Sequence, residues 1–128
     1  MWYNSKMNTF YVQNKAKGAV DMKLAIIGSR CLTVAHLEEY IPQGVTEIVS
    51  GGAKGIDRCA EAYAREHGIK LTEFLPAYAR YGRAAPLRRN EQIVAYADAV
   101  LAFWDGESAG TKYVIGLCQA CGKPVQVV

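Results

Sequence analysis

Long apolar runs, strong net charge and histidine are all scarce in this 128-residue sequence. No run approaches the ~20 apolar residues that a bilayer-spanning helix needs. The first residues also lack the apolar block and small-residue cleavage site of a secretory signal. Hydrophobic residues make up 51% and charged residues 21% of the chain, which allows a packed core and argues against general disorder. We therefore expect one cytoplasmic globular domain with no membrane partner.

The net charge of +3 is small and unevenly placed. Residues 1–21 contribute +2 of it through three lysines and one aspartate, which leaves +1 for residues 22–128. A dedicated duplex-DNA binder carries a broad basic footprint. Nucleic-acid binding by this chain would therefore have to depend on a local basic patch.

The four cysteines do not form a recognisable disulfide or zinc framework. Cys118 and Cys121 make a lone C-x-x-C late in a helical pattern, without a second pair or a nearby histidine to complete a tetrahedral site. We expect reduced thiols that serve packing, with no metal site. Metal or redox use of the pair is the alternative.

Two parts of the chain differ in pattern. Residues 1–21 are polar and aromatic without a clear period, whereas residues 22–128 alternate strand-like and helix-like segments. The first part is either a flexible arm or an over-long gene start whose natural initiator is Met22, and we favour the second interpretation. We therefore expect an N-terminal extension over 1–21 and one domain over 22–128.

Five apolar runs and four amphipathic segments alternate along the domain. The expected strands are Leu24–Gly28, Glu47–Ser50, Lys70–Leu75, Ala99–Trp104 and Pro124–Val128. The expected helices are Val34–Ile41, Ile56–His67, Leu87–Ala97 and Ala109–Ala120, with a polar loop from Pro76 to Pro86. This alternation predicts an α/β fold, a Rossmann-like three-layer sandwich with a mainly parallel five-stranded sheet. Ligands of such sheets bind outside the carboxyl ends of the strands.

The loop after the first strand is the first candidate for ligand contact. Gly28, Ser29 and Arg30 supply close backbone approach, a hydroxyl and a planar guanidinium suited to phosphate or carboxylate. An ordinary turn with a solvated arginine is the alternative.

The loop after the second strand is glycine-rich and leads directly into a helix. Its candidate ligand contacts are Ser50, Gly51, Gly52, Ala53, Lys54, Gly55 and Asp57. Converging N–H groups and the helix start favour a bound anion such as phosphate. The spacing matches neither the Walker A loop nor the dinucleotide G-x-G-x-x-G pattern. Asp57 is either a ligand contact or a helix-start residue favoured by the dipole.

Two further segments complete the expected edge. The stretch from Ala77 to Asn90 carries four arginines and two tyrosines but no acidic residue, and Arg89 and Asn90 are the pair expected to face a ligand. The loop after the fourth strand is a second anion-binding helix start, with Asp105, Gly106, Ser108, Gly110 and Thr111 as candidates. Asp105 either orients a ribose hydroxyl or forms a turn before glycine.

Hydrolytic chemistry has little support in the sequence. His36 and His67 fall in helical segments away from the expected edge, and no pair of loop carboxylates suits acid–base work. We therefore assign no catalytic residue and no resident cofactor.

Four segments together resemble one superfamily. They are Met22–Arg30, Ser50–Asp57, Arg89-Asn90 and Trp104–Thr111, the last reading W-D-G-E-S-A-G-T. In this order they are similar to the SLOG superfamily, Rossmann-like domains shared by the DNA-processing protein A group and the LOG phosphoribohydrolases. The resemblance covers residues 22–128 and is greatest to a small single-domain branch of bacteria and phages.

The resemblance implies binding or sensing of a nucleotide or nucleotide-derived ligand, by a homodimer. Ile93, Tyr96, Tyr113 and Leu117 are candidates for a helical dimer face, with core packing as the alternative role. LOG enzymes carry P-G-G-x-G-T-x-x-E, and Arg89 matches the arginine that works with that glutamate. Residues Gly110 to Val114 contain no glutamate. Cleavage of a nucleotide N-glycosidic bond is therefore the alternative function, and single-stranded DNA binding through the arginine-rich loop is the second alternative.

Overall fold

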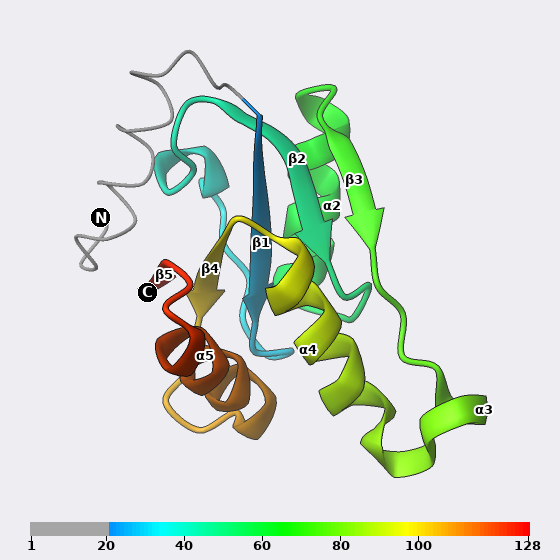
Figure 1. Ribbon diagram of the computed structural model, residues 1–128. Helices are drawn as coiled ribbons and strands as arrows, with labels where there is room; N and C mark the ends of the chain where they lie inside the picture. Colours follow the sequence, from blue (N-terminus) through cyan, green and yellow to red (C-terminus); the bar gives the residue numbers. More distant parts are fainter. Residues whose placement is uncertain (1–20) are drawn as a thin grey trace.

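The computed structural model describes residues 21–128, which form one five-stranded sheet with helices on both faces (Figure 1). The strands are β1 (Met22–Gly28), β2 (Val45–Ser50), β3 (Lys70–Glu73), β4 (Ala99–Phe103) and β5 (Val125–Val127). All neighbouring strands pair in parallel, in the order β3-β2-β1-β4-β5. The predicted Rossmann-like α/β fold is confirmed.

The central strand shows how sequence and layers correspond. Leu24 and Ile26 of β1 pack on one face of the sheet, while Ala25 and Ile27 pack on the other. Burial on both faces explains the continuous apolar run, because parallel sheets are covered by helices on each side. The registers Leu24 with Ile48 and Leu24 with Ala99 align β1 with both of its neighbours.

Three longer helices supply the two outer layers. Helix α2 (Ile56–Glu66) covers one face through Ile56, Ala60 and Ala64, which lie four residues apart and are buried. Helices α4 (Ala85–Tyr96) and α5 (Ala109–Cys121) lie side by side on the opposite face (Figure 1). The Ser108 hydroxyl oxygen caps α5 by accepting from the Thr111 N–H, and Gly122 ends the helix at φ 73°.

The expected helix over Val34–Ile41 is wrong. This segment holds only one 3-10 turn, η1 (Leu37–Glu39), and no side chain caps it. An eight-residue helix gains little on its own, whereas the irregular path lets Leu37 become buried against the α2 side of the sheet. His36, expected in a helix, precedes this turn and is exposed. His67, by contrast, follows the last turn of α2 as its C-cap.

The expected polar loop from Pro76 to Pro86 also differs from the structure. It contains the short helix α3 (Tyr78–Tyr81), a 3-10 turn η2 (Gly82–Ala84) and the first two residues of α4. Pro86 sits in the first turn of α4, where a missing N–H is tolerated. Strand and helix boundaries elsewhere agree with the predictions or differ from them by at most two residues.

The remaining predictions outside the site have mixed outcomes. The expected extension over 1–21 lies, apart from Asp21, outside the described residues. Cys118 is buried in the core and Cys121 is exposed. Of the suggested dimer face, Ile93 is buried, and Tyr96 and Leu117 pack against the same cluster, so these three contribute to the core. No helix between residues 21 and 128 is long and apolar enough to cross a bilayer.

Candidate functional site

A cavity of about 420 Å³ opens at the carboxyl edge of the sheet. The loops after β1, β2 and β4 meet there with the first turns of α4 and α5. Its lining consists of Ile27, Gly28, Ser29, Arg30, Cys31, Gly51, Ala53, Asp57, Pro86, Arg89, Asn90, Ile93, Asp105, Ser108, Gly110, Thr111 and Val114. This is the edge at which parallel α/β sheets bind ligands.

Most of the residues that the sequence singles out meet at this cavity. The lining includes Gly28, Ser29, Arg30, Gly51, Ala53, Asp57, Arg89, Asn90, Asp105, Ser108, Gly110 and Thr111. The other candidates, Ser50, Gly52, Lys54, Gly55 and Gly106, lie outside it. The structure thus brings all four predicted segments together, although residues 90 and 105 are far apart in sequence from residue 28.

Two of the five residues outside the lining shape the loop after β2. The Ser50 hydroxyl accepts from the Gly52 N–H at 3.3 Å and is fully buried. Gly55 has φ 69°, and a Cβ there would lie 2.5 Å from the carbonyl oxygen of Arg30. Gly55 therefore lets the loops after β1 and β2 touch, which no other residue would allow without movement.

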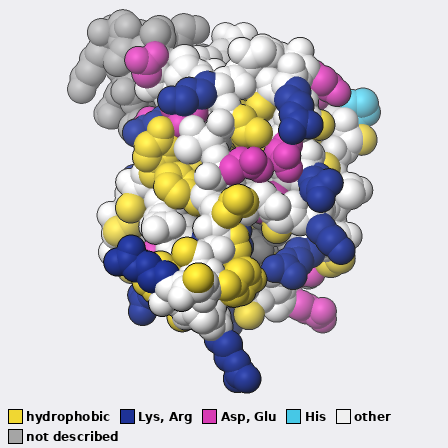
Figure 2. Space-filling view, turned by 90° about the vertical axis from the view of Figure 1, so that its right-hand side faces the viewer, with side chains coloured by type: hydrophobic (Ala, Val, Ile, Leu, Met, Phe, Trp, Pro, Cys, Tyr) yellow, Lys and Arg dark blue, Asp and Glu magenta, His cyan; other side chains and the backbone are white. Residues whose placement is uncertain are grey.

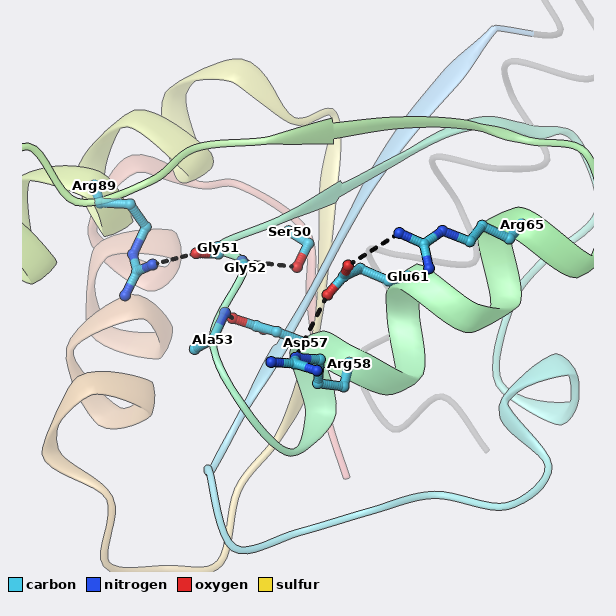
Figure 3. A network of polar contacts seen from close by, with 9 residues as sticks. All are labelled: Ser50, Gly51, Gly52, Ala53, Asp57, Arg58, Glu61, Arg65 and Arg89. Atoms are coloured by element: carbon cyan, nitrogen blue, oxygen red, sulfur yellow. Dashed lines mark hydrogen bonds and ion pairs between the residues drawn. The ribbon is translucent and has the colours of Figure 1, made fainter.

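Arg89 and Asp57 approach the glycine loop from opposite sides (Figure 3). The Arg89 Nη1 donates to the Gly51 carbonyl oxygen at 2.6 Å, and its Nε donates to Asn90 Oδ1 at 2.9 Å. The Asp57 Oδ2 accepts from the Ala53 N–H at 3.0 Å. Gly51 lies between them, because a Cβ there would be 2.6 Å from Arg89 Nη1 and 3.1 Å from Asp57 Oδ2.

Burial perturbs both of these charged groups. It raises the pKa of Asp57, while the Ala53 N–H and the Arg89 charge act in the opposite direction. It also lowers the pKa of Arg89, and the charge of Asp57 acts against that change. Arg89 is 8% exposed and Asp57 is 6% exposed. A guanidinium held this way is a rigid donor at the wall of the cavity.

The loop after β4 is organised by Asp105. Its Oδ1 accepts from the N–H groups of Glu107 and Ser108, both at 2.8 Å, and these bonds lower the pKa of Asp105 to about 2. Its Oδ2 accepts from the Cys31 thiol at 3.3 Å. Asp105 therefore forms the turn before α5 through one carboxylate oxygen and binds Cys31, another residue of the cavity lining, through the other.

The arginine-rich stretch divides into two groups. Arg89 and Asn90 line the cavity, whereas Arg88 forms an ion pair with Glu91 at 2.8 Å on the outer face of α4. Arg80 and Arg83 are exposed, and Arg80 lies 5.1 Å from the centre of the Tyr81 ring. No acidic residue lies between Ala77 and Asn90, and Glu91, the next residue of α4, supplies the counter-charge for Arg88.

Sequence reasoning missed five lining residues: Ile27, Cys31, Pro86, Ile93 and Val114. Helical spacing could have found two of them, since Pro86 and Ile93 lie three and four residues from Arg89 on the same face of α4. Val114 likewise lies four residues after Gly110 in α5. Cys31 directly follows Arg30, and nothing in its sequence context marks it. Within residues 21–128, no cluster of three histidine, cysteine or carboxylate side chains is placed to hold a metal ion.

Comparison with known proteins identifies related sequences. Residues 24–81 match the model of the YspA, cpYpsA-related SLOG family. The chain is also similar to the Gene 61 protein of Mycobacterium phage D29, with 37% identity over 90 residues that cover 66% of this chain and 71% of the phage protein. No solved structure matches. The chain belongs to the SLOG superfamily.

Proposed function

We propose that this protein binds, and through binding senses, a nucleotide or nucleotide-derived small molecule in the cavity at the carboxyl edge of the sheet. One observation carries the proposal. A buried guanidinium, two glycine-flanked loops and the first turn of α5 all converge on a single 420 Å³ cavity. SLOG membership supports a nucleotide-related role in general terms.

Donors for phosphate come from both walls of the cavity. On one wall, Arg89 and the loop at Gly51 and Ala53 face the cavity, with Arg30 exposed at its rim. On the other wall, the Thr111 N–H already donates to the Ser108 hydroxyl, while the N–H groups before it in α5 have no acceptor within the helix, and the helix dipole adds partial positive charge. Ser50, Gly52, Lys54 and Gly55 lie outside the lining of the cavity.

The cavity also contains acceptors for hydroxyl groups. The Asp57 carboxylate is buried beside Arg89, and the Asp105 Oδ2 faces the thiol of Cys31. Carboxylates bind ribose hydroxyls in nucleotide folds. We therefore place sugar hydroxyls near these two acids and phosphates near the guanidinium and the helix start.

Binding without hydrolysis is favoured by the apolar side chain at Val114. This residue occupies the position at which the LOG motif has glutamate, and it is 1% exposed at the cavity wall. Without a carboxylate at that point, nothing there activates water or stabilises an oxocarbenium-like centre.

The test is a thermal-shift screen of the full chain at high ligand excess. The panel contains nucleoside mono-, di- and triphosphates, cyclic nucleotides, dinucleotides, ADP-ribose, NAD and a short oligonucleotide. A ligand that binds the folded state raises the melting temperature by mass action. Chromatography of the mixtures for released base detects turnover, and its presence would favour the N-glycosidic enzyme instead.

A pair of glycines in α5 provides matched variants. In Gly110→Ala the new methyl enters the cavity wall, where its nearest neighbour is Asn90 Nδ2 at 3.8 Å, so the protein itself tolerates it. Gly116→Ala meets no atom within 4 Å and lies outside the lining. Both changes favour the helix by up to about 1 kcal/mol. We expect the ligand-induced rise in melting temperature to be smaller in Gly110→Ala and unchanged in Gly116→Ala.

Two outcomes would overturn the proposal. If a ligand raises the melting temperature of the two glycine variants equally, its binding site does not lie in the cavity. A salt-sensitive shift with the oligonucleotide, together with none for any mononucleotide, would favour single-stranded DNA binding.

A further inference from the structure

The segment that joins β3 to α4 carries exposed apolar side chains. Leu75 and Tyr78 are 63% and 57% exposed, and Leu87, just beyond the segment, is 43% exposed. Val128 is the only other exposed large hydrophobic side chain in residues 21–128. We call residues 75–84 the arm, and Figure 1 shows its helix α3 projecting beyond the end of β3. The arm therefore presents apolar surface that the described part of the chain leaves uncovered.

The arm is also basic. Arg80 and Arg83 are its only charged residues, and both are exposed. Neither forms an ion pair with a carboxylate between residues 21 and 128, whereas Arg88 beyond the arm is paired with Glu91. Figure 2 shows the β3 side of the molecule, where hydrophobic side chains gather in the lower part of the face with basic side chains beside them. The arm thus combines two unpaired cations with apolar side chains.

The loop between β1 and β2 has the opposite charge. Residues 32–44, which we call the acidic segment, contain no lysine or arginine. Glu38 and Glu39 of η1 are both exposed. The Glu38 Oε1 lies 3.6 Å from the Nδ1 of His36, and Glu39 has no ion pair within residues 21–128. The acidic segment therefore presents two carboxylates without a lysine or arginine partner.

The arm and the acidic segment cannot neutralise each other within one molecule. Figure 1 shows α3 at the lower right and the cyan turn that contains η1 at the upper left, on opposite corners of the molecule. Helix α2 packs beside η1, but its Arg58 and Arg65 already form ion pairs with Glu61. Exposed surfaces of opposite charge attract each other when two molecules meet. Each molecule thus carries two complementary surfaces that only another copy can bring together.

We infer that the arm of one copy of this protein docks on the acidic segment of a second copy. Arg80 and Arg83 then face Glu38 and Glu39, and the apolar side chains of the arm lose their contact with water. The contact joins two different surfaces, so each copy provides one arm and one acidic segment. Neither segment lines the cavity, so the inference does not depend on the proposed ligand. Exposed ion pairs contribute little each, and the association is therefore weak and sensitive to salt.

The first test is sedimentation velocity of the full chain at increasing concentration, up to about 1 mM. In about 0.05 M sodium chloride the average mass should rise with concentration. In about 0.5 M sodium chloride the rise should be much smaller, because salt screens exposed charges.

An exchange of charges tests the pairing itself. Arg80→Glu with Arg83→Glu, and separately Glu38→Arg with Glu39→Arg, place like charges at the contact. Each double variant should weaken self-association about tenfold or more. An equimolar mixture of the two variants restores opposite charges at every contact and should associate as the unchanged chain does. The chain with all four exchanges has the original net charge of +3 and should also associate by itself.

Two further variants separate the contact from general effects of charge. Lys54→Glu with Lys112→Glu changes the net charge as much as the exchange in the arm does, at two exposed lysines outside both segments. This control should leave self-association unchanged. Tyr78→Ala keeps the charge and should weaken self-association through loss of apolar contact. Circular dichroism of each variant establishes that the fold is intact.

Three results would overturn the inference. The first is an unchanged chain that stays monomeric up to about 1 mM. The second is self-association that neither the mixture nor the fourfold exchange restores, because surfaces other than these two segments would then be in contact. The third is binding of a single-stranded oligonucleotide that is lost in Arg80→Glu with Arg83→Glu, without self-association, which would assign the arm to nucleic acid.

Discussion

The two walls of the cavity are both rich in glycine, yet they use glycine for different reasons. In the wall built by the loops after β1 and β2, a Cβ on Gly28, Gly51, Gly52 or Gly55 would approach another atom within 2.5–2.6 Å. In the wall built by the loop after β4, a Cβ on Gly106 would meet no atom within 4 Å, and a Cβ on Gly110 would meet only one, at 3.8 Å. The first wall is crowded and set by packing, whereas the second has room and is held by backbone N–H groups that donate to the Asp105 carboxylate and the Ser108 hydroxyl.

The comparison shows that similar composition can hide different constraints. A side chain at Gly28 or Gly55 would press on backbone atoms of another element, so it strains the fold, whereas the nearest atoms at Gly51 and Gly52 belong to the side chains of Arg89 and Leu75. A substitution in the second wall changes the space left for a ligand. Substitutions in the first wall should therefore mainly lower stability, and substitutions in the second wall should mainly lower ligand binding.

The largest effect is expected for Gly55→Ala in the crowded wall. Its φ of 69° lies in a region that side chains rarely adopt, and the new Cβ would lie 2.5 Å from the Arg30 carbonyl oxygen. Overpacking and backbone strain together should lower the free energy of unfolding by about 3 kcal/mol. Urea denaturation measures it, and a loss below about 1 kcal/mol would contradict the account of this wall.

Arg89→Ala should have the next largest effect, because it acts on both stability and binding. The change removes the bond to the Gly51 carbonyl oxygen and should cost about 2 kcal/mol of unfolding free energy. It also removes the cation beside Asp57, so the pKa of Asp57 should rise further. Arg88→Ala on the outer face of the same helix is the control, and nucleotide binding should survive only in the control.

Gly106→Ala is the counterpart of Gly55→Ala in the open wall. Its φ is 86°, but no atom lies within 4 Å of the new Cβ, so only the backbone preference opposes the change. The expected loss is about 1 kcal/mol in the same urea experiment. A loss as large as that of Gly55→Ala would remove the distinction between the walls.

The smallest effect is expected at acid pH, for Asp105→Asn. The pKa of Asp105 is lowered from 3.8 to about 2 by the N–H groups of Ser108 and Glu107. A carboxylate with a lowered folded-state pKa stabilises the protein above its unfolded value, and that contribution is lost as pH falls toward 2. The variant should show a shallower fall in melting temperature between about pH 4 and pH 2. An unchanged slope would mean that these bonds do not control the open wall.

Sequence patterns were sufficient for the sheet and for three of the four expected helices, because those segments carry strong periodic signals. The segment after β1 was not predictable in this way. Leu37 and its apolar neighbours have a spacing that suits a helix, but packing against the α2 side favours an irregular path. Tertiary contacts decide such short segments, and they leave no local mark in the sequence.

The sequence predicted that four segments meet at one edge of the sheet, but it did not predict which residues of these segments line the cavity. Helix phase separates Arg88 from Arg89, which explains why one pairs outward with Glu91 and the other faces inward. Composition alone could not show that Ser50 and Gly55 support the loop from behind. Nor could it show that Asp105 is committed to a turn through one oxygen only.

The strand order also determines at which point of synthesis the sheet and the cavity can be completed. Strand β1 lies between β2 and β4, and Leu24 pairs with residue Ala99, which the ribosome adds much later. A growing chain that has reached α4 can assemble β3-β2-β1 with the crowded wall of the cavity. It still lacks β4 and the open wall, and one edge of its central strand is unpaired. Binding of the proposed ligand in this cavity therefore requires the last quarter of the chain, which contains β4 and the open wall.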